Sequence, residues 1–207
     1  MNIRVGIAML VALASLCGCA VNPVTGSSDF VMMSEKDELS LGSKAYQQVL
    51  QQYPIYQDEK LRAYVQQVGE KVASNSHRSN LQYQFSVVDS GDINAFALPG
   101  GYIFINRGLL AYLNSEAELA AVLGHEVGHV TARHGVRQQS QAQARETLGR
   151  LVAIGPGAGA AGDPTDVVGS AVVTGYGRDM ELEADGLGAQ YLARSGYDPQ
   201  AMIQVIE

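Results

Sequence analysis

Residues 125–129 read His125-Glu126-Val127-Gly128-His129, and this run decides which fold and which chemistry the sequence predicts. The two histidines are four residues apart, so on a helix they lie about 40° apart around the axis and one turn along it. Two imidazoles at that spacing can bind one metal ion. Glu126 lies about 100° around the axis from His125, where its carboxylate can reach a water at the metal rather than the metal itself. The run is therefore typical of a catalytic zinc site with Glu126 as its general base.

The motif lies within a stretch that has the pattern of one helix. Ser115 and Glu118 form a capping box at its start, and we expect the helix to run to about His134, before Gly135. Two histidines and a glutamate in so apolar a stretch would be costly to bury without partners, and a zinc ion is such a partner. Chance produces His-Glu-x-x-His with odds on the order of one in 200 in a chain of this length. Ordinary core histidines are the weaker alternative.

A catalytic zinc ion needs a third protein ligand from elsewhere in the chain. His134 follows the first histidine by nine residues, which places it about 180° around the same expected helix. Glu181 and Asp185 are four residues apart on one face of a later helix, so one carboxylate can bind the metal while the other hydrogen-bonds a ligand imidazole. Glu183 lies about 200° around that helix from Glu181. The spacing selects Glu181 as the third ligand, and it predicts that neither Glu183 nor His134 affects the metal.

Three segments resemble those of one peptidase family. They are residues 125–134 (HEVGHVTARH), residues 177–185 (GRDMELEAD) and residues 94–101 (NAFALPGG). From about residue 34 onward the chain is similar to the gluzincin zinc endopeptidases, which include the HtpX heat-shock peptidases, the CAAX prenyl proteases and the periplasmic β-barrel assembly-enhancing protease. The likeness is strongest to the lipoprotein or periplasmic members. It implies one Zn²⁺ per chain.

The resemblance also implies a role for each site residue. It assigns His125, His129 and Glu181 as zinc ligands, Glu126 as the base, and Asp185 as a catalytic residue that either donates a proton or supports a ligand. The group that stabilises the oxyanion stays open, and the candidates are Tyr176, Arg178, His134 or a residue beyond position 207. Gly177 stands where the family often has Ser, and no role depends on it.

The remaining pattern predicts an α+β fold, a mainly helical zincin-type metallopeptidase domain with a small β-sheet next to the active-site helix. Further helices are expected at residues 34–54, 58–75, 136–151 and 179–194, and a last one begins at Asp198-Pro199. The glycine-rich run at residues 155–162 lacks the Lys-Ser/Thr ending of a phosphate loop, so we expect a mobile loop near the active site.

Strands are expected between residues 81 and 105. Alternation from Leu81 to Asp89 predicts a strand with one solvent-facing side, and two more strands flank a turn that contains Pro99. An edge strand can bind an extended peptide as an added strand, and the segment Asn94–Ile105 is our candidate for this role. An ordinary hairpin is the alternative that the sequence alone favours.

The first 18 residues are typical of a lipoprotein signal peptide. Arg4 precedes the apolar segment Val5–Leu16, which is shorter than the roughly 20 residues needed to span a bilayer. Its ending, Leu-Cys-Gly-Cys, resembles a bacterial lipobox. This resemblance implies a lipidated Cys19 at the mature N-terminus, and Ala20 in place of Asp implies sorting to the outer membrane, facing the periplasm. We expect residues 19–33 to be a linker and residues 34–207 the peptidase domain, which continues beyond this chain.

Charge and composition argue against a nucleic-acid partner. The chain has 14 Lys and Arg against 21 Asp and Glu, a formal net charge of −7, and no basic run. Two functions then fit the sequence. The first is an endopeptidase that cleaves misfolded or stalled cell-envelope proteins, possible outer-membrane proteins among them; the alternative is a lipid-anchored periplasmic chaperone or binding module with an idle or structural zinc site. Intact Glu126 favours the enzyme, because a structural site needs no base.

Overall fold

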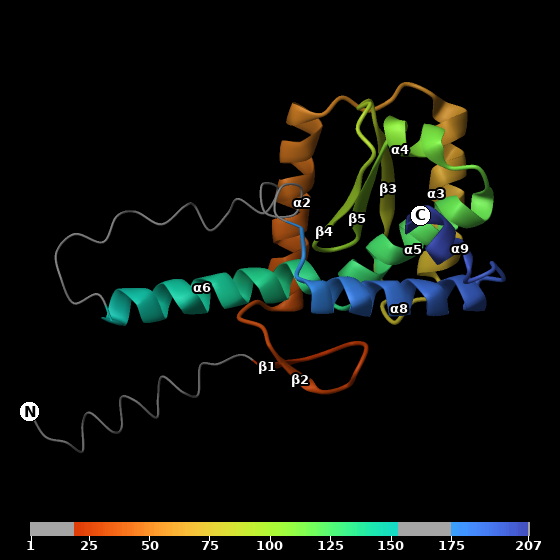
Figure 1. The fold of residues 1–207 in the computed structure, drawn as a ribbon. Helices are drawn as coiled ribbons and strands as arrows, with labels where there is room; N and C mark the ends of the chain where they lie inside the picture. The colour runs from red at the N-terminus through yellow and green to blue at the C-terminus, as the bar shows by residue number, and fades with distance from the viewer. Residues whose placement is uncertain (1–18, 153–174, 207) are drawn as a thin grey trace, which may run out of the picture.

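A computed structural model describes residues 19–152 and 175–206 (Figure 1). The described part is mainly helical with one three-stranded sheet, which confirms the expected fold class. The predicted signal peptide and the glycine-rich run at 155–162 lie outside the described residues. None of the described helices is long and apolar enough to cross a bilayer.

The segment expected as a linker contains a short antiparallel hairpin. Strands β1 (Cys19–Val21) and β2 (Ser28–Phe30) pair with each other, and the Asn22 amide donates to Asp29 across the hairpin at 2.7 Å. The Met32 amide then donates to the buried Ser140 hydroxyl at 3.0 Å, which ties the segment to a later helix. Its connection to a lipid stays a prediction.

Three of the helices begin at the caps that the sequence predicts. Ser34, Asp58 and Ser115 each accept a hydrogen bond from the amide three residues on. Gly196, at φ 80°, follows α8 in the left-handed conformation expected after a helix end. The helices are α2 (Glu35–Gln52), α3 (Glu59–Ala73), α4 (Arg107–Tyr112), α5 (Glu116–Thr131), α6 (His134–Val152), α8 (Arg178–Arg194) and α9 (Ala201–Ile206).

The motif helix α5 ends earlier than expected. It stops at Thr131, and His134 is the first residue of α6. Between them Arg133 adopts φ 55°, a left-handed conformation that breaks the helix. The Arg133 guanidinium donates to Glu38 of α2 at 2.8 Å, and this buried carboxylate also accepts from Arg78 at 2.7 Å. The prediction that one helix reaches His134 is therefore wrong, because a tertiary ion pair holds the turn.

The sheet consists of β3 (Gln84–Val88), β4 (Ala95–Leu98) and β5 (Tyr102–Asn106), in the order β3-β5-β4. Helix α2 packs on one face, while α3 and α5 pack on the other (Figure 1). The strand β3 is therefore buried on both faces after its first residue. The prediction that this strand has a solvent-facing side is wrong, because Tyr46 of α2 reaches Ser86 and covers that side.

Strand β4 is an edge strand, and its backbone has one free side. The register places Asn94 directly opposite Asn106, whose amide donates to the Asn94 carbonyl at 3.0 Å. Hydrogen-bonded pairs alternate in an antiparallel ladder, so Phe96 also bonds to β5, whereas the N–H and C=O groups of Ala95 and Ala97 point outward. Strand β5 is central. Within Asn94–Ile105 the free edge therefore belongs to β4 only, a shorter stretch than expected.

Helices α5 and α8 pack with their backbones in near contact. A Cβ atom at Gly128 would lie 2.8 Å from the Ala184 carbonyl oxygen, and one at Gly188 would lie 3.0 Å from the His125 nitrogen. Gly124 completes this interface, where a Cβ atom would meet a Leu192 methyl at 2.7 Å. Small residues thus recur at four-residue spacing on both helices, and they let the two motif-bearing segments approach closely.

We expect Gly128→Ala to destabilise the protein, although alanine is the better helix former. The added methyl group meets backbone that cannot move aside, and overpacking of this kind costs about 1–3 kcal/mol. Gly186→Ala on the exposed side of α8 is the matched control, because a Cβ atom there meets nothing within 4 Å. It should stabilise the protein by about 0.5–1 kcal/mol. Urea unfolding of both variants measures the difference, and equal effects would contradict the close-packing explanation.

Candidate metal centre and its pocket

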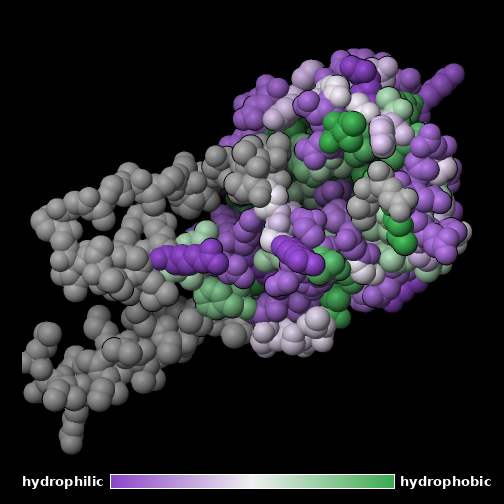
Figure 2. All heavy atoms as spheres, viewed as in Figure 1, coloured by the Kyte–Doolittle hydropathy of each residue, from purple (hydrophilic) through white to green (hydrophobic). Residues whose placement is uncertain are grey.

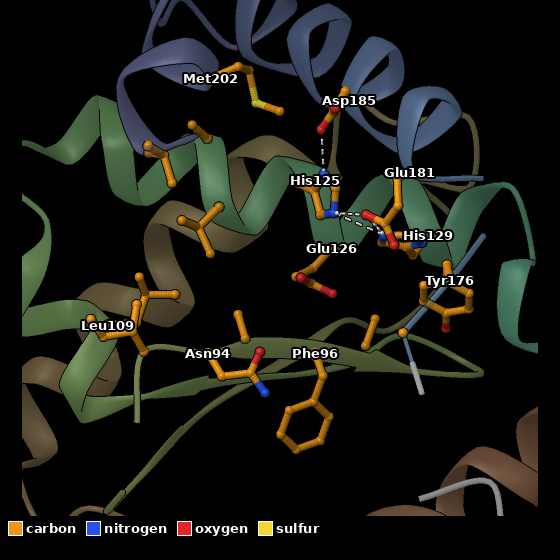
Figure 3. Close-up of a pocket in the computed structure, with 17 residues that line it drawn as sticks. Asn94, Phe96, Leu109, His125, Glu126, His129, Tyr176, Glu181, Asp185 and Met202 are labelled. Atoms are coloured by element: carbon orange, nitrogen blue, oxygen red, sulfur yellow. Dashed lines mark hydrogen bonds and ion pairs between the residues drawn. The ribbon is translucent and has the colours of Figure 1, made fainter. Parts of the chain in front are cut away.

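Three side chains from α5 and α8 converge on one point (Figure 3). The ligand-type atoms of His125, His129 and Glu181 all lie within 4.8 Å of one another, and no other such group occurs among the described residues. The two histidine Nε2 atoms are 2.9 Å apart, and Glu181 Oε2 lies 3.3 Å from the first and 3.7 Å from the second. Interaction with the His129 imidazole lowers the pKa of Glu181. The structure thus brings together the three residues that the sequence spacing selects.

Asp185 supports the first of these histidines from behind. Its Oδ1 atom lies 2.8 Å from His125 Nδ1, one helical turn beyond Glu181 (Figure 3). The carboxylate fixes the ring so that Nε2 faces Glu181 and His129. This is the contact expected from the four-residue spacing of Glu181 and Asp185.

His129 has a different partner, which helical spacing did not predict. Its Nδ1 atom lies 2.8 Å from Nδ1 of His134, and His134 Nε2 lies 3.1 Å from Glu183 Oε2. Glu183 also accepts from Arg137 at 2.9 Å. His134 is fully buried, and burial lowers its pKa to about 4. Neither His134 nor Glu183 joins the three converging side chains, and the break at Arg133 turns His134 back toward His129.

Glu126 lies beside the three converging residues without joining them. The residue is 7% exposed, and its carboxylate points into the space between α5 and β4 (Figure 3). Burial raises its pKa, while the charges of His129 and His125 act in the opposite direction. It is therefore placed to exchange a proton with a molecule in that space.

That space is a pocket of about 460 Å³. The candidate ligands and Glu126 form one wall, and residues 93–97 along β4 form the opposite wall (Figure 3). Leu109, Val122 and Met202 make one end apolar. A hollow is visible between the sheet and α8 on the face shown in Figure 2, where hydrophobic residues lie beside hydrophilic ones. The pocket is thus bordered by a donor cluster, a carboxylate and a free strand edge.

Residues 59–206 match the model of peptidase family M48. The chain belongs to this family. It is 33% identical over 189 residues to the β-barrel assembly-enhancing protease of Yersinia pestis, an alignment that covers 87% of this chain and 39% of that protein. It is 31% identical over 196 residues to the protein of the same name from Escherichia coli K12, covering 89% and 40%.

A more distant relative is the mitochondrial metalloendopeptidase OMA1 of Schizosaccharomyces pombe, with 29% identity over 192 residues, or 86% of this chain and 54% of that protein. The chain spans about 40% of the length of the bacterial relatives described above. The alignments therefore cover most of this chain, whereas these proteins also contain sequence that this chain does not match.

The structure distinguishes between Tyr176, Arg178 and His134, the three candidates for stabilising an oxyanion in this M48 domain. Tyr176 lines the pocket and stacks on His129, with ring centroids 4.2 Å apart. Burial, followed by the charges of Glu126 and Glu181, raises the pKa of its phenol. Its hydroxyl, however, points past the histidine toward Gly135. Arg178 is exposed, and neither it nor the buried His134 lines the pocket. None of the three directs a donor at the space beside Glu126.

Proposed function

We propose that the chain contains the catalytic domain of a zinc-dependent endopeptidase. The observation that carries the proposal is the convergence of His125, His129 and Glu181 beside a buried carboxylate in an open pocket. Two imidazoles and one carboxylate are a donor set typical of catalytic zinc, which leaves a further position free. When bound, zinc supplies a Lewis acid that polarises the scissile carbonyl and makes a nearby water more acidic.

Glu126 is the general base in this proposal. It accepts a proton from the attacking water and passes it to the leaving nitrogen, a role for which its buried position and raised pKa are suited. Asp185 keeps the His125 ring in the orientation that presents Nε2 to the metal. Since Asp185 also lines the pocket, proton donation by this residue stays open.

The free edge of β4 is the proposed guide for the substrate backbone. An extended peptide can pair with the outward N–H and C=O groups of Ala95 and Ala97, opposite the wall formed by α5. This position runs the peptide past Glu126 and the metal ligands. The apolar end of the pocket can then accept one substrate side chain.

We further propose that the protein acts on misfolded or stalled envelope proteins, outer-membrane proteins among them. Lipidation of Cys19 would anchor it to the outer membrane, facing the periplasm, with residues 34–207 as the peptidase domain. Support comes from the lipobox-like ending at Cys19 and from relatives named β-barrel assembly-enhancing proteases. A lipid-anchored chaperone with an idle zinc site is the alternative. Glu126 and the open pocket favour the enzyme, since a structural site is closed by a fourth ligand.

Glu126→Gln should abolish cleavage while zinc stays bound. The amide preserves the shape of the side chain and loses the base, so we expect casein hydrolysis to fall by at least about 100-fold. Metal analysis of the same preparation provides the second readout. Chelation of wild-type protein should abolish cleavage, and zinc should restore it. An active Glu126→Gln variant would contradict the assignment of the base, and chelator-resistant activity would contradict the role of the metal.

Glu181→Ala should remove most of the bound zinc, because it deletes one of three ligands. Asp185→Ala should weaken zinc binding by about 10- to 100-fold through the loss of support for His125. Asp179→Ala removes an exposed carboxylate from the first turn of the same helix, so it serves as the control and should bind zinc normally. Competition with a chromophoric chelator gives the three affinities. Normal zinc affinity in Glu181→Ala would refute the metal site.

Ala95→Pro tests the strand edge by deleting one outward N–H group. We expect kcat/KM for an unfolded protein substrate to fall by about 2- to 10-fold, which corresponds to the net free energy of one hydrogen bond. Zinc affinity should not change. Ala95→Gly keeps the N–H and is the control. Proline at Phe96 is unsuitable, because that amide faces β5 and its loss would damage the sheet. Unchanged cleavage by the Ala95→Pro variant would contradict the proposal that β4 binds the substrate backbone.

A further inference from the structure

The two candidate histidine ligands are supported in different ways. His125 contacts the carboxylate of Asp185 directly. His129 contacts a second imidazole, that of His134, and the carboxylate of Glu183 lies one step further away. A direct carboxylate partner has a clear role in orienting a ligand ring. The series of hydrogen bonds behind His129, through His134 to Glu183, needs a separate explanation.

The proposed zinc site, on which this inference rests, determines the direction of each hydrogen bond from His129 through His134 to Glu183. His129 presents Nε2 to the converging cluster, so a metal there requires its proton on Nδ1. The His134 Nδ1 atom, 2.8 Å away, must then accept that hydrogen bond. His134 consequently carries its own proton on Nε2, which donates to Glu183 Oε2 at 3.1 Å. One arrangement of protons satisfies every contact.

Neighbouring residues hold this series of hydrogen bonds in place. Arg137 donates to the same Glu183 oxygen at 2.9 Å and keeps that group a carboxylate, which is an acceptor only. His134 is fully buried, so no water competes for its nitrogens. The turn that precedes it is held by the ion pair between Arg133 and Glu38. The orientation of the His134 ring is thus determined on both sides.

We propose that His134 is a positioning residue for the metal site. It accepts the Nδ1 proton of His129, so that the ligand imidazole has the correct tautomer and ring orientation for zinc, and Glu183 with Arg137 fixes His134 in turn. This proposal departs from the sequence-based expectation that His134 and Glu183 leave the metal unaffected. The competing explanation is that His134 only fills space in the core.

Two substitutions at His134 separate these explanations. His134→Phe keeps a ring of similar volume and removes the acceptor, and His134→Asn loses volume but places an oxygen near the position of Nδ1. We expect His134→Phe to weaken zinc affinity by about 10- to 100-fold, and His134→Asn to recover most of that loss. A space-filling role predicts the opposite order, with the phenylalanine variant closer to wild type. Chelator competition measures zinc affinity, and thermal unfolding of the metal-free proteins reports packing separately.

His77→Phe is the matched control. His77 also bonds through its ring, to the Tyr191 hydroxyl at 2.7 Å, but it does not contact the metal site. Its loss should leave zinc affinity unchanged. Equal zinc affinity in wild type and His134→Phe would overturn the proposal for His134 alone, and so would equal weakening in the two His134 variants. A wild-type chain that binds no zinc would overturn the proposed function, and the role of His134 with it.

Discussion

The near contact between the backbones of α5 and α8 is the constraint on which the site depends. Glu181 on α8 must reach the two histidines of α5 across this interface, and small interface residues shorten the distance between the two helices. Gly128 against Ala184 and Gly188 against Gly124 permit that approach. The glycines thus weaken each helix slightly as a separate element, and they bring Glu181 close to His125 and His129.

Helix α8 connects this contact to the rest of the domain through three acidic residues. Glu181 and Asp185 share the face that meets α5, whereas Glu183 turns toward α6 and binds His134 and Arg137. The left-handed turn at Arg133 brings the start of α6 into this position, and Glu38 of α2 holds the turn. Because α2 also covers the sheet, one buried ion-pair cluster couples the sheet face to the support of His129.

Local patterns in the sequence were sufficient for every described helix except α4, for the caps at Ser34, Asp58 and Ser115, and for grouping Glu181 with the two histidines. They depend on interactions within a few residues, which a sequence displays directly. The break at Arg133 could not be predicted, because arginine favours helices and its left-handed conformation depends on Glu38, 95 residues away. Burial of Ser86 likewise depends on Tyr46 of another element. The four-residue spacing of Gly124 and Gly128 was a usable signal of close helix packing.

Electrostatics explain why so polar a cluster persists in an apolar interface. Burial raises the pKa of Glu126, and the nearby charge of Glu181 raises it further, so two carboxylates in this space oppose each other's ionisation. The imidazoles of His129 and His125 offset part of that cost. A divalent cation bound by the imidazoles and Glu181 would offset far more, because its charge acts on both carboxylates at short range and low dielectric. The same charge that stabilises the cluster would then make Glu126 an ionised base at neutral pH, so binding and catalysis would share one electrostatic origin.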